Sequence, residues 1–251
     1  MTILVSALSV LSLALQDPPM PVMPGVAMAE RVSAQSQNPT AEGCDLSVRE
    51  AAVRNAEGLF VGSSICFQIG QEDDAIFLLL AAQARAMADM ELALPATLPQ
   101  PDENGRVDMS NVPEPPFGVI DLYGFIYGYG GGLGQTEFYR DVDRTDHLFA
   151  RLRAWGPVRP ADYDPGWAGS REASNEAYAA SIQTNVEHRI GQLTPLAVLY
   201  RDDVYFGLQQ EVEALLAANN NSFKAGTPAY EQYQAVQAAM DQRRRELGVE
   251  Y

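Results

Sequence analysis

The sequence predicts an all-α protein of about seven helices, arranged as an irregular bundle or an array of hairpins, with little or no β-sheet. Apolar residues recur every three or four positions in several stretches, as they do on the buried face of a helix. No segment alternates apolar and polar residues over five or more positions, as a half-buried strand would. Glycine and proline then divide the chain into helices of ordinary length.

Residues that start and stop helices place these elements along the chain. The stretch Ser47-Val48-Arg49-Glu50 matches a capping box and opens a short helix. Gly70 ends the next helix, and the acidic turn Glu72-Asp73-Asp74 suits the N-terminus of a third. Thr-Pro pairs at 194–195 and 227–228 start two later helices. In order, the predicted helices cover residues 47–57, 59–69, 72–93, 135–155, 170–193, a short stretch from 194, 204–218 with Asp203 as its cap, and 228–247.

The N-terminal part of the chain has the pattern of an export signal. Residues 3–15 form a single, mainly apolar run of thirteen residues, which is too short to cross a bilayer but fits the apolar region of a signal peptide. Ala27-Met28-Ala29 and Ala14-Leu15-Gln16 both offer a cleavage site. We therefore predict a signal peptide and cleavage region over 1–29 and a disordered leader over 30–43. The alternative for the apolar run is a buried amphipathic helix of the mature protein.

The two cysteines of the chain, Cys44 and Cys66, are predicted to form a disulfide. Short loops make consecutive helices antiparallel, so the start of the first helix lies beside the end of the second. A bridge there closes a loop of about twenty residues and contributes about 3 kcal/mol in the chain-entropy model. The alternative is a pair of buried free thiols. A disulfide favours a periplasmic or secreted location.

Five residues in the hairpin 47–93 follow the spacing of a helical repeat. Bulky, turn-glycine, small, bulky and small residues stand in that order at Cys66, Gly70, Ala75, Leu79 and Ala82. The hairpin thereby resembles a single tetratricopeptide or Sel1-type repeat, and no second copy follows at a fixed period. The resemblance implies a binding scaffold rather than a catalyst.

A proline-rich stretch predicts a division of the chain. Six prolines lie within residues 95–116, a density that no helix tolerates. We expect a linker or a long surface loop there. The predicted parts are thus a helical hairpin subdomain over 44–94 and a C-terminal helical domain over 117–251.

The net charge of the chain limits the classes of molecule that it is expected to bind. The formal net charge is −16, which disfavours binding to nucleic acid and to anionic lipid headgroups. It favours a basic protein partner, or else serves only solubility. No apolar run is long enough for a membrane span.

The glycine-rich stretch from Tyr127 to Phe138 is a candidate binding region. It does not match a dinucleotide-binding loop, because the positions that would need glycine hold Leu133 and Gln135, and it lacks the Lys-Ser/Thr end of a P-loop. One alternative is a turn where helices pack closely. The other is an aromatic groove for a peptide or a sugar, formed by Tyr123, Tyr127, Tyr129, Glu137 and Tyr139.

No catalytic residue, metal site or cofactor is predicted. The chain lacks the zinc motif H-E-x-x-H, and the stretch beginning Asp141-Val142-Asp143 lacks the glycine and the glutamate of a calcium loop. We therefore expect an exported, non-enzymatic binding protein of the cell envelope, with an adaptor, inhibitor or immunity-type role. The alternative is an envelope-directed hydrolase that cleaves glycans with Glu137 as its acid.

Overall fold

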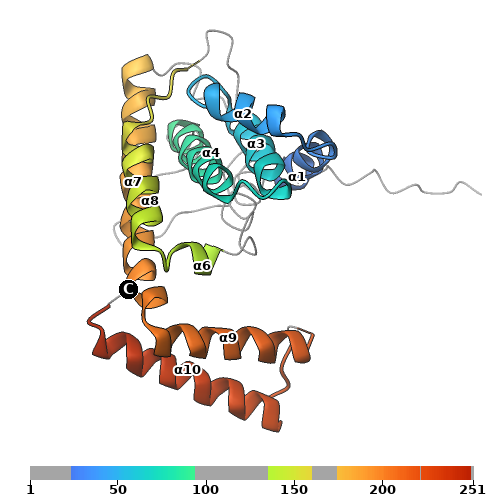
Figure 1. Ribbon diagram of the computed structural model, residues 1–251, viewed down its shortest axis with the longest axis vertical. Coiled ribbons are helices and arrows are strands. Elements are labelled where there is room, and N and C mark those ends of the chain that lie inside the picture. The colour runs from blue at the N-terminus through green and yellow to red at the C-terminus, as the bar shows by residue number, and fades with distance from the viewer. Residues whose placement is uncertain (1–23, 94–134, 160–173, 221, 250–251) are drawn as a thin grey trace, which may run out of the picture.

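The computed structural model describes residues 24–93, 135–159, 174–220 and 222–249, and these residues form helices without a β-strand (Figure 1). The predicted all-α class is therefore confirmed. The helices are α1 (Pro24–Gln35), α2 (Ala41–Arg49), α3 (Ala56–Gln68), α4 (Glu72–Ala93), α6 (Gln135–Phe138), α7 (Val142–Ala154), α8 (Asn175–Arg201), α9 (Asp203–Ala218) and α10 (Pro228–Glu246). None of them is long and apolar enough to cross a membrane.

Helix α4 is the centre of the main core. Its residues from Ala75 to Ala86 are all buried, which suits a helix that is apolar on every side. Helix α3 packs along α4, α8 crosses it, and α2 and α7 also contact it. The main core therefore draws on residues from both sides of the proline-rich stretch 95–116, which itself lies outside the described residues.

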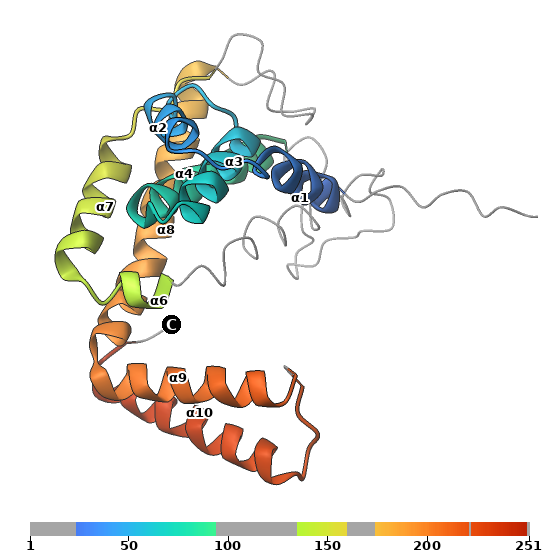
Figure 2. The same ribbon diagram turned by 45° about the vertical axis from the view of Figure 1, so that its right-hand side comes forward.

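Helices α9 and α10 form an antiparallel hairpin with a core of its own. Val212, Val236 and Met240 are buried between the two helices, and Leu199 and Tyr205 complete this core at the end of α8. The long helix α8 runs from the main body to the hairpin, so the hairpin projects from the foot of the molecule (Figures 1 and 2). We call this element the α9–α10 hairpin.

The disulfide between Cys44 and Cys66 is present and joins α2 to α3. The two Cα atoms are 4.9 Å apart, and both residues are fully buried. The prediction of this pairing is confirmed, because the short connection between the helices brings the start of α2 beside the end of α3.

Helix α2 begins earlier than predicted. Its N-cap is Thr40, whose side chain accepts a hydrogen bond from the backbone N–H of Gly43. Ser47 lies inside the helix and donates to the Gly43 carbonyl instead of capping. The capping-box prediction at Ser47 was therefore wrong, because the hydroxyl group bonds back to the preceding turn.

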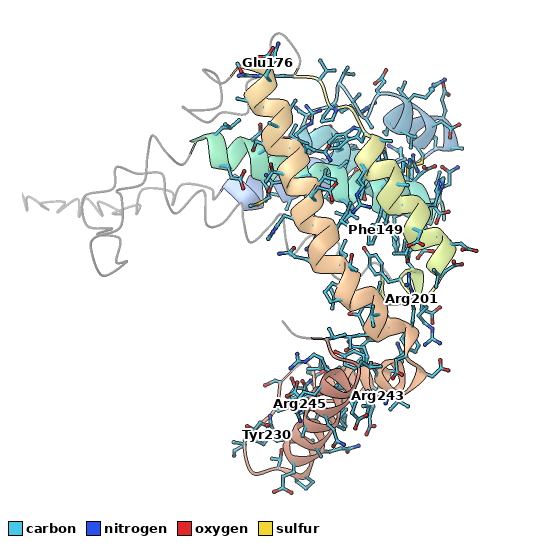
Figure 3. The ribbon with its side chains drawn as sticks, turned by 90° about the vertical axis from the view of Figure 1, so that its left-hand side faces the viewer. Phe149, Glu176, Arg201, Tyr230, Arg243 and Arg245 are labelled. Carbon is cyan, nitrogen blue, oxygen red and sulfur yellow. A yellow bond between two sulfur atoms is a disulfide. The ribbon has the colours of Figure 1, made fainter. Side chains whose placement is uncertain are left out.

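Helix α8 continues through Pro195, where a new helix was predicted. Pro195 removes one backbone donor inside the helix. The hydroxyl group of Thr194 donates a hydrogen bond to the Ile190 carbonyl, so a side-chain donor bonds to a backbone acceptor of the preceding turn. Figure 3 shows α8 as one unbroken element. The predicted restart at Thr194 was wrong, because burial of the apolar face on both sides of the proline holds the helix together.

The predicted helix 135–155 is divided into α6 and α7. Asp141 caps α7 by accepting a hydrogen bond from the backbone N–H of Arg144. Phe138 and Tyr139, at the break, are both buried. The turn between α6 and α7 brings both rings into the core. In an unbroken helix, neighbouring side chains would leave the axis in directions about 100° apart.

Residues predicted as leader contribute to the fold. Residues 30–35 belong to α1, where Val32 is fully buried, and Arg31 forms an ion pair with Glu57 of α3 at 2.9 Å. Helix α2 starts at Ala41. The apolar run 3–15 lies outside the described residues.

Candidate functional site

The predicted aromatic groove is only partly within the described residues. Tyr123, Tyr127 and Tyr129 lie outside them. Glu137 is exposed on the short helix α6, whereas Tyr139 is only 1% exposed. These two side chains therefore lie in different environments, although they are two positions apart.

The phenol of Tyr139 is enclosed in the core. Burial raises the pKa of Tyr139 well above its ordinary value, and the positive charge of Arg189 opposes this shift without cancelling it. Its hydroxyl group has no hydrogen-bond partner among the residues that the structure describes. Phe138 contacts the ring edge to face, with centroids 5.5 Å apart. Tyr139 is thus a neutral packing residue at neutral pH.

Arg85 is the most deeply buried charged side chain of the described structure, with no exposed surface. Its guanidinium group donates to the Ala52 carbonyl at 2.9 Å and to the Val158 carbonyl at 3.3 Å. It also lies against the rings of Trp155 and Tyr178, at 5.6 and 5.8 Å from their centroids. One side chain of α4 therefore connects the α2–α3 loop, the segment after α7 and the start of α8.

The acidic first turn of α4 is paired with arginines of α7. Arg144 donates to Glu72 at 2.8 Å and to Asp73 at 2.9 Å, and Arg151 contacts Asp74 at 2.7 Å. A shallow hollow of about 300 Å³ lies beside this turn. The three carboxylates thus fix α7 against α4 while they also favour the N-terminus of α4.

Polar side chains join α4 to α8. Arg189 donates to the amide oxygen of buried Gln83 at 3.0 Å. Nearer the end of α4, Glu91 accepts from Asn185 at 2.9 Å and from Ser181 at 3.0 Å. These bonds fix the register of the two longest helices of the main body.

The α9–α10 hairpin is anchored to the body at one end. Asp202, the N-cap of α9, forms a two-pronged ion pair with Arg243 of α10, with distances of 2.6 and 3.0 Å. The hydrogen bonds from Arg243 and from the backbone N–H of Tyr205 lower the pKa of Asp202 to about 2. Arg140 donates to Asp203 and stacks on Phe206 at 4.1 Å.

The opposite end of the hairpin carries aromatic side chains. Phe223 stacks on Tyr233 with ring centroids 4.7 Å apart, and both rings are half-buried. Tyr230, also half-buried, lies in the first turn of α10 (Figure 3). We call Phe223, Tyr230 and Tyr233 the hairpin tip. The end of the hairpin where α9 is connected to α10 is the end remote from α8 (Figure 1), and Tyr230 is labelled there in Figure 3.

The two histidines lie on separate helices. His147 and His188 are both exposed, on α7 and α8, and the ring Nε2 of His188 lies 2.9 Å from the Gln192 amide nitrogen. Within the described ranges, no three His, Cys, Asp or Glu side chains are grouped so that they could hold a metal ion.

Comparison with known proteins yields no relative: no protein-family model, no curated protein and no solved structure matches this chain.

Sequence reasoning missed Arg85 and the hairpin tip. Arg85 did leave a signal, because it is the only charged residue between Asp74 and Asp89 in α4. A single arginine in a helix that is buried on all sides must find acceptors in the core. The tip gave a weaker signal, because Phe223 lies outside any helix and its stacking partner is ten residues away.

Proposed function

We propose that this protein is an exported, non-enzymatic binding protein of the cell envelope, and that the hairpin tip is its main contact surface. The supporting observation is the placement of three aromatic side chains at the free end of a projecting two-helix element. The buried disulfide supports the oxidising location, because a bridge of this kind persists outside the cytosol.

The aromatic residues of the tip are suited to anchor a partner. Tyr and Phe bury large areas for few rotatable bonds, and aromatic residues are enriched in interfaces. The stack of Phe223 on Tyr233 holds both rings before any partner arrives, which lowers the entropy cost of binding. Tyr230 adds a phenol that can both pack and form a hydrogen bond.

The net charge gives a second, longer-range contribution. A chain of net charge −16 attracts a basic protein and raises the rate of encounter. The tip then supplies the short-range contacts that determine the lifetime of the complex. The proposed partner is therefore a basic protein with an apolar pocket for the aromatic side chains.

A photo-crosslinking residue at position 230 tests this proposal in the producing cells. A crosslinked partner is identified by mass spectrometry, purified and titrated against the wild type and Tyr230→Ala. We expect Kd to rise about 30-fold, the effect of losing a central aromatic anchor. Gln210→Ala, at an exposed position of α9, is the matched control and should leave Kd unchanged. Equal affinity of Tyr230→Ala and the wild type would refute the assignment of the tip.

The alternative, an envelope hydrolase with Glu137 as its acid, has a direct test. Purified wild type is incubated with cell-wall glycan, and released reducing ends are measured. Activity that disappears in Glu137→Gln with an unchanged helix signal would establish the hydrolase. The exposed position of Glu137 on α6 does not favour this alternative, because a glycosidase acid usually needs a pocket that keeps it protonated.

A further inference from the structure

The outward face of α10 carries a regular set of exposed side chains. Helix α10 packs on α9 through Val236 and Met240, which are both buried. At about 100° per residue, the opposite face is formed by five residues that are all exposed. They are Glu231, Gln234, Ala238, Gln242 and Arg245.

The positions of this outward face are evenly spaced about Ala238, and its two ends carry opposite charges. Glu231 lies seven residues before it and Arg245 seven residues after it, while Gln234 and Gln242 lie four residues on either side. An antiparallel helix with the same face would place its Arg245 opposite Glu231 and its Glu231 opposite Arg245. The face is therefore complementary in charge to a second copy of itself.

The two charged ends of this face have no ion-pair partner among the described residues. Neither Glu231 nor Arg245 forms an ion pair with any residue that the structure describes. The neighbouring Arg243, by contrast, is paired with Asp202. Figure 3 shows Arg243 and Arg245 on different sides of α10, as the helical spacing requires.

The same face is sterically accessible. Helix α10 lies on the side of α9 that is turned away from the main body (Figures 1 and 2). The small side chain of Ala238 at the centre allows two helix axes to approach to about 8 Å. A second copy can therefore reach the full length of α10 without meeting the main body of the first.

The charge of the hairpin also permits self-association. Residues 199–249 contain seven acidic and five basic side chains, so this part carries only −2 of the net charge of −16. Most of the negative charge therefore lies outside the hairpin. At about 0.15 M salt the Debye length is about 8 Å, so charges on the two main bodies are largely screened from each other.

We propose that two copies of this protein associate through an antiparallel α10–α10 contact, with Ala238 near the two-fold axis and a Glu231–Arg245 ion pair at each end. A second copy is the occupant that this arrangement of charges fits, because in an antiparallel contact each charged end meets the opposite charge. This contact uses a surface different from the hairpin tip, so the proposal is independent of the proposed function. Because the ion pairs are exposed and the central residue is small, the dimer is weak.

Sedimentation velocity of the full chain tests this dimer at concentrations from about 10 µM to about 1 mM in about 0.15 M salt. We expect a reversible monomer–dimer equilibrium in the wild type. Glu231→Arg or Arg245→Glu alone places like charges opposite each other and should raise Kd at least about tenfold. The double variant Glu231→Arg/Arg245→Glu restores opposite charges, and its Kd should return to within about threefold of the wild type.

A steric variant and a matched control complete the test. Ala238→Arg puts two long cations at the centre of the contact and should abolish the dimer. Ala214→Arg makes the same change at an exposed position of α9, which the contact does not use, and should leave Kd unchanged. Circular dichroism verifies that each variant keeps its helices. A wild type that stays monomeric at the highest concentration would overturn the proposal, and so would a dimer that is insensitive to Arg245→Glu and Ala238→Arg.

Discussion

Replacement of Arg85 by methionine tests how the core is held together. Methionine fills nearly the same elongated space, so the change removes the charge and the donors while it keeps most of the packing. Alanine at the same position removes the packing as well. The pair of variants therefore separates the polar contribution of Arg85 from its contribution to core volume.

The structure indicates what methionine would lose. Two hydrogen bonds from a charged group to backbone carbonyls disappear, at about 1.5–3 kcal/mol each before compensation. The Ala52 carbonyl also accepts a hydrogen bond from the backbone N–H of Val158 at 2.7 Å, which the substitution leaves in place. The Val158 carbonyl is therefore the acceptor that the loss of Arg85 affects more. Contacts of the guanidinium with the Trp155 and Tyr178 rings contribute about 0.5–2 kcal/mol each.

An opposing term reduces this loss. A guanidinium with no exposed surface pays a desolvation cost of several kcal/mol, which methionine does not pay. The expected net effect of Arg85→Met is a loss of about 2 kcal/mol in the free energy of unfolding, since the lost contacts exceed the relieved desolvation only modestly. Arg85→Ala should cost about 2 kcal/mol more, because it also leaves a cavity.

Urea denaturation followed by circular dichroism measures both variants. Arg153→Met is the control, because Arg153 is about half exposed and pairs with Glu187 on the surface of α7 and α8. We expect the control to lose less than about 1 kcal/mol. If Arg85→Met is as stable as the wild type, the polar contacts of Arg85 contribute nothing net, and its role in connecting three segments is refuted.

Three further predictions follow from the packing and the charges. Replacing Cys44 and Cys66 by serine should lower the free energy of unfolding by about 3 kcal/mol and the melting temperature by about 6–12 °C, as measured by calorimetry; an unchanged melt would exclude the bridge. Gly62→Ala should lower the free energy of unfolding by about 1–3 kcal/mol, because its new Cβ would lie 2.5 Å from a side-chain carbon of α2. Gly191→Ala, in open space on α8, should instead raise the free energy of unfolding by up to about 1 kcal/mol. Because the pKa of Asp202 falls from 3.8 to about 2 on folding, its ion pair stabilises the fold above about pH 4, and this stabilisation is lost as the pH drops toward 2. Asp202→Asn should remove that part of the pH dependence of the free energy of unfolding. Identical pH profiles for the variant and the wild type would contradict this prediction.

Local signals in the sequence were sufficient where a single residue determines the backbone. Gly70 has a positive φ of 79°, as a helix-ending glycine requires, and the predicted stop is correct. Thr227 caps α10 and Pro228 is its first residue, again as predicted. The disulfide was predictable for a related reason, because a short connection leaves two consecutive helices few ways to pack.

Predictions failed where distant packing competes with a local signal. Pro195 disfavours a continuous helix, but α8 buries apolar residues before and after it, including Ile190 and Ala197. The break between α6 and α7 depends on burial of Phe138 and Tyr139, which no local pattern reveals. In both places the tertiary core decides the conformation of the chain.

The candidate surfaces could not be predicted from residue spacing alone. One is formed by two chain segments, and the other is recognised only once the exposed side of α10 is known. The stack at the hairpin tip joins the α9–α10 loop to the second turn of α10. The outward face of α10 is visible in the sequence only after the opposite face of this helix is known to be buried. The part of the predicted groove that contains Tyr123, Tyr127 and Tyr129 stays a prediction, because it lies outside the described residues.

The two cores differ in how they are stabilised, and this difference bears on where binding occurs. The main core combines extensive apolar burial with a disulfide and a buried arginine that connects three segments. The hairpin has few buried residues and relies on a polar joint at Asp202 and Arg243. Surfaces that bind partners are commonly carried by elements with less burial, because such elements can adjust without disturbing the main fold. Both proposed contacts, the hairpin tip and the outward face of α10, lie on this less buried element.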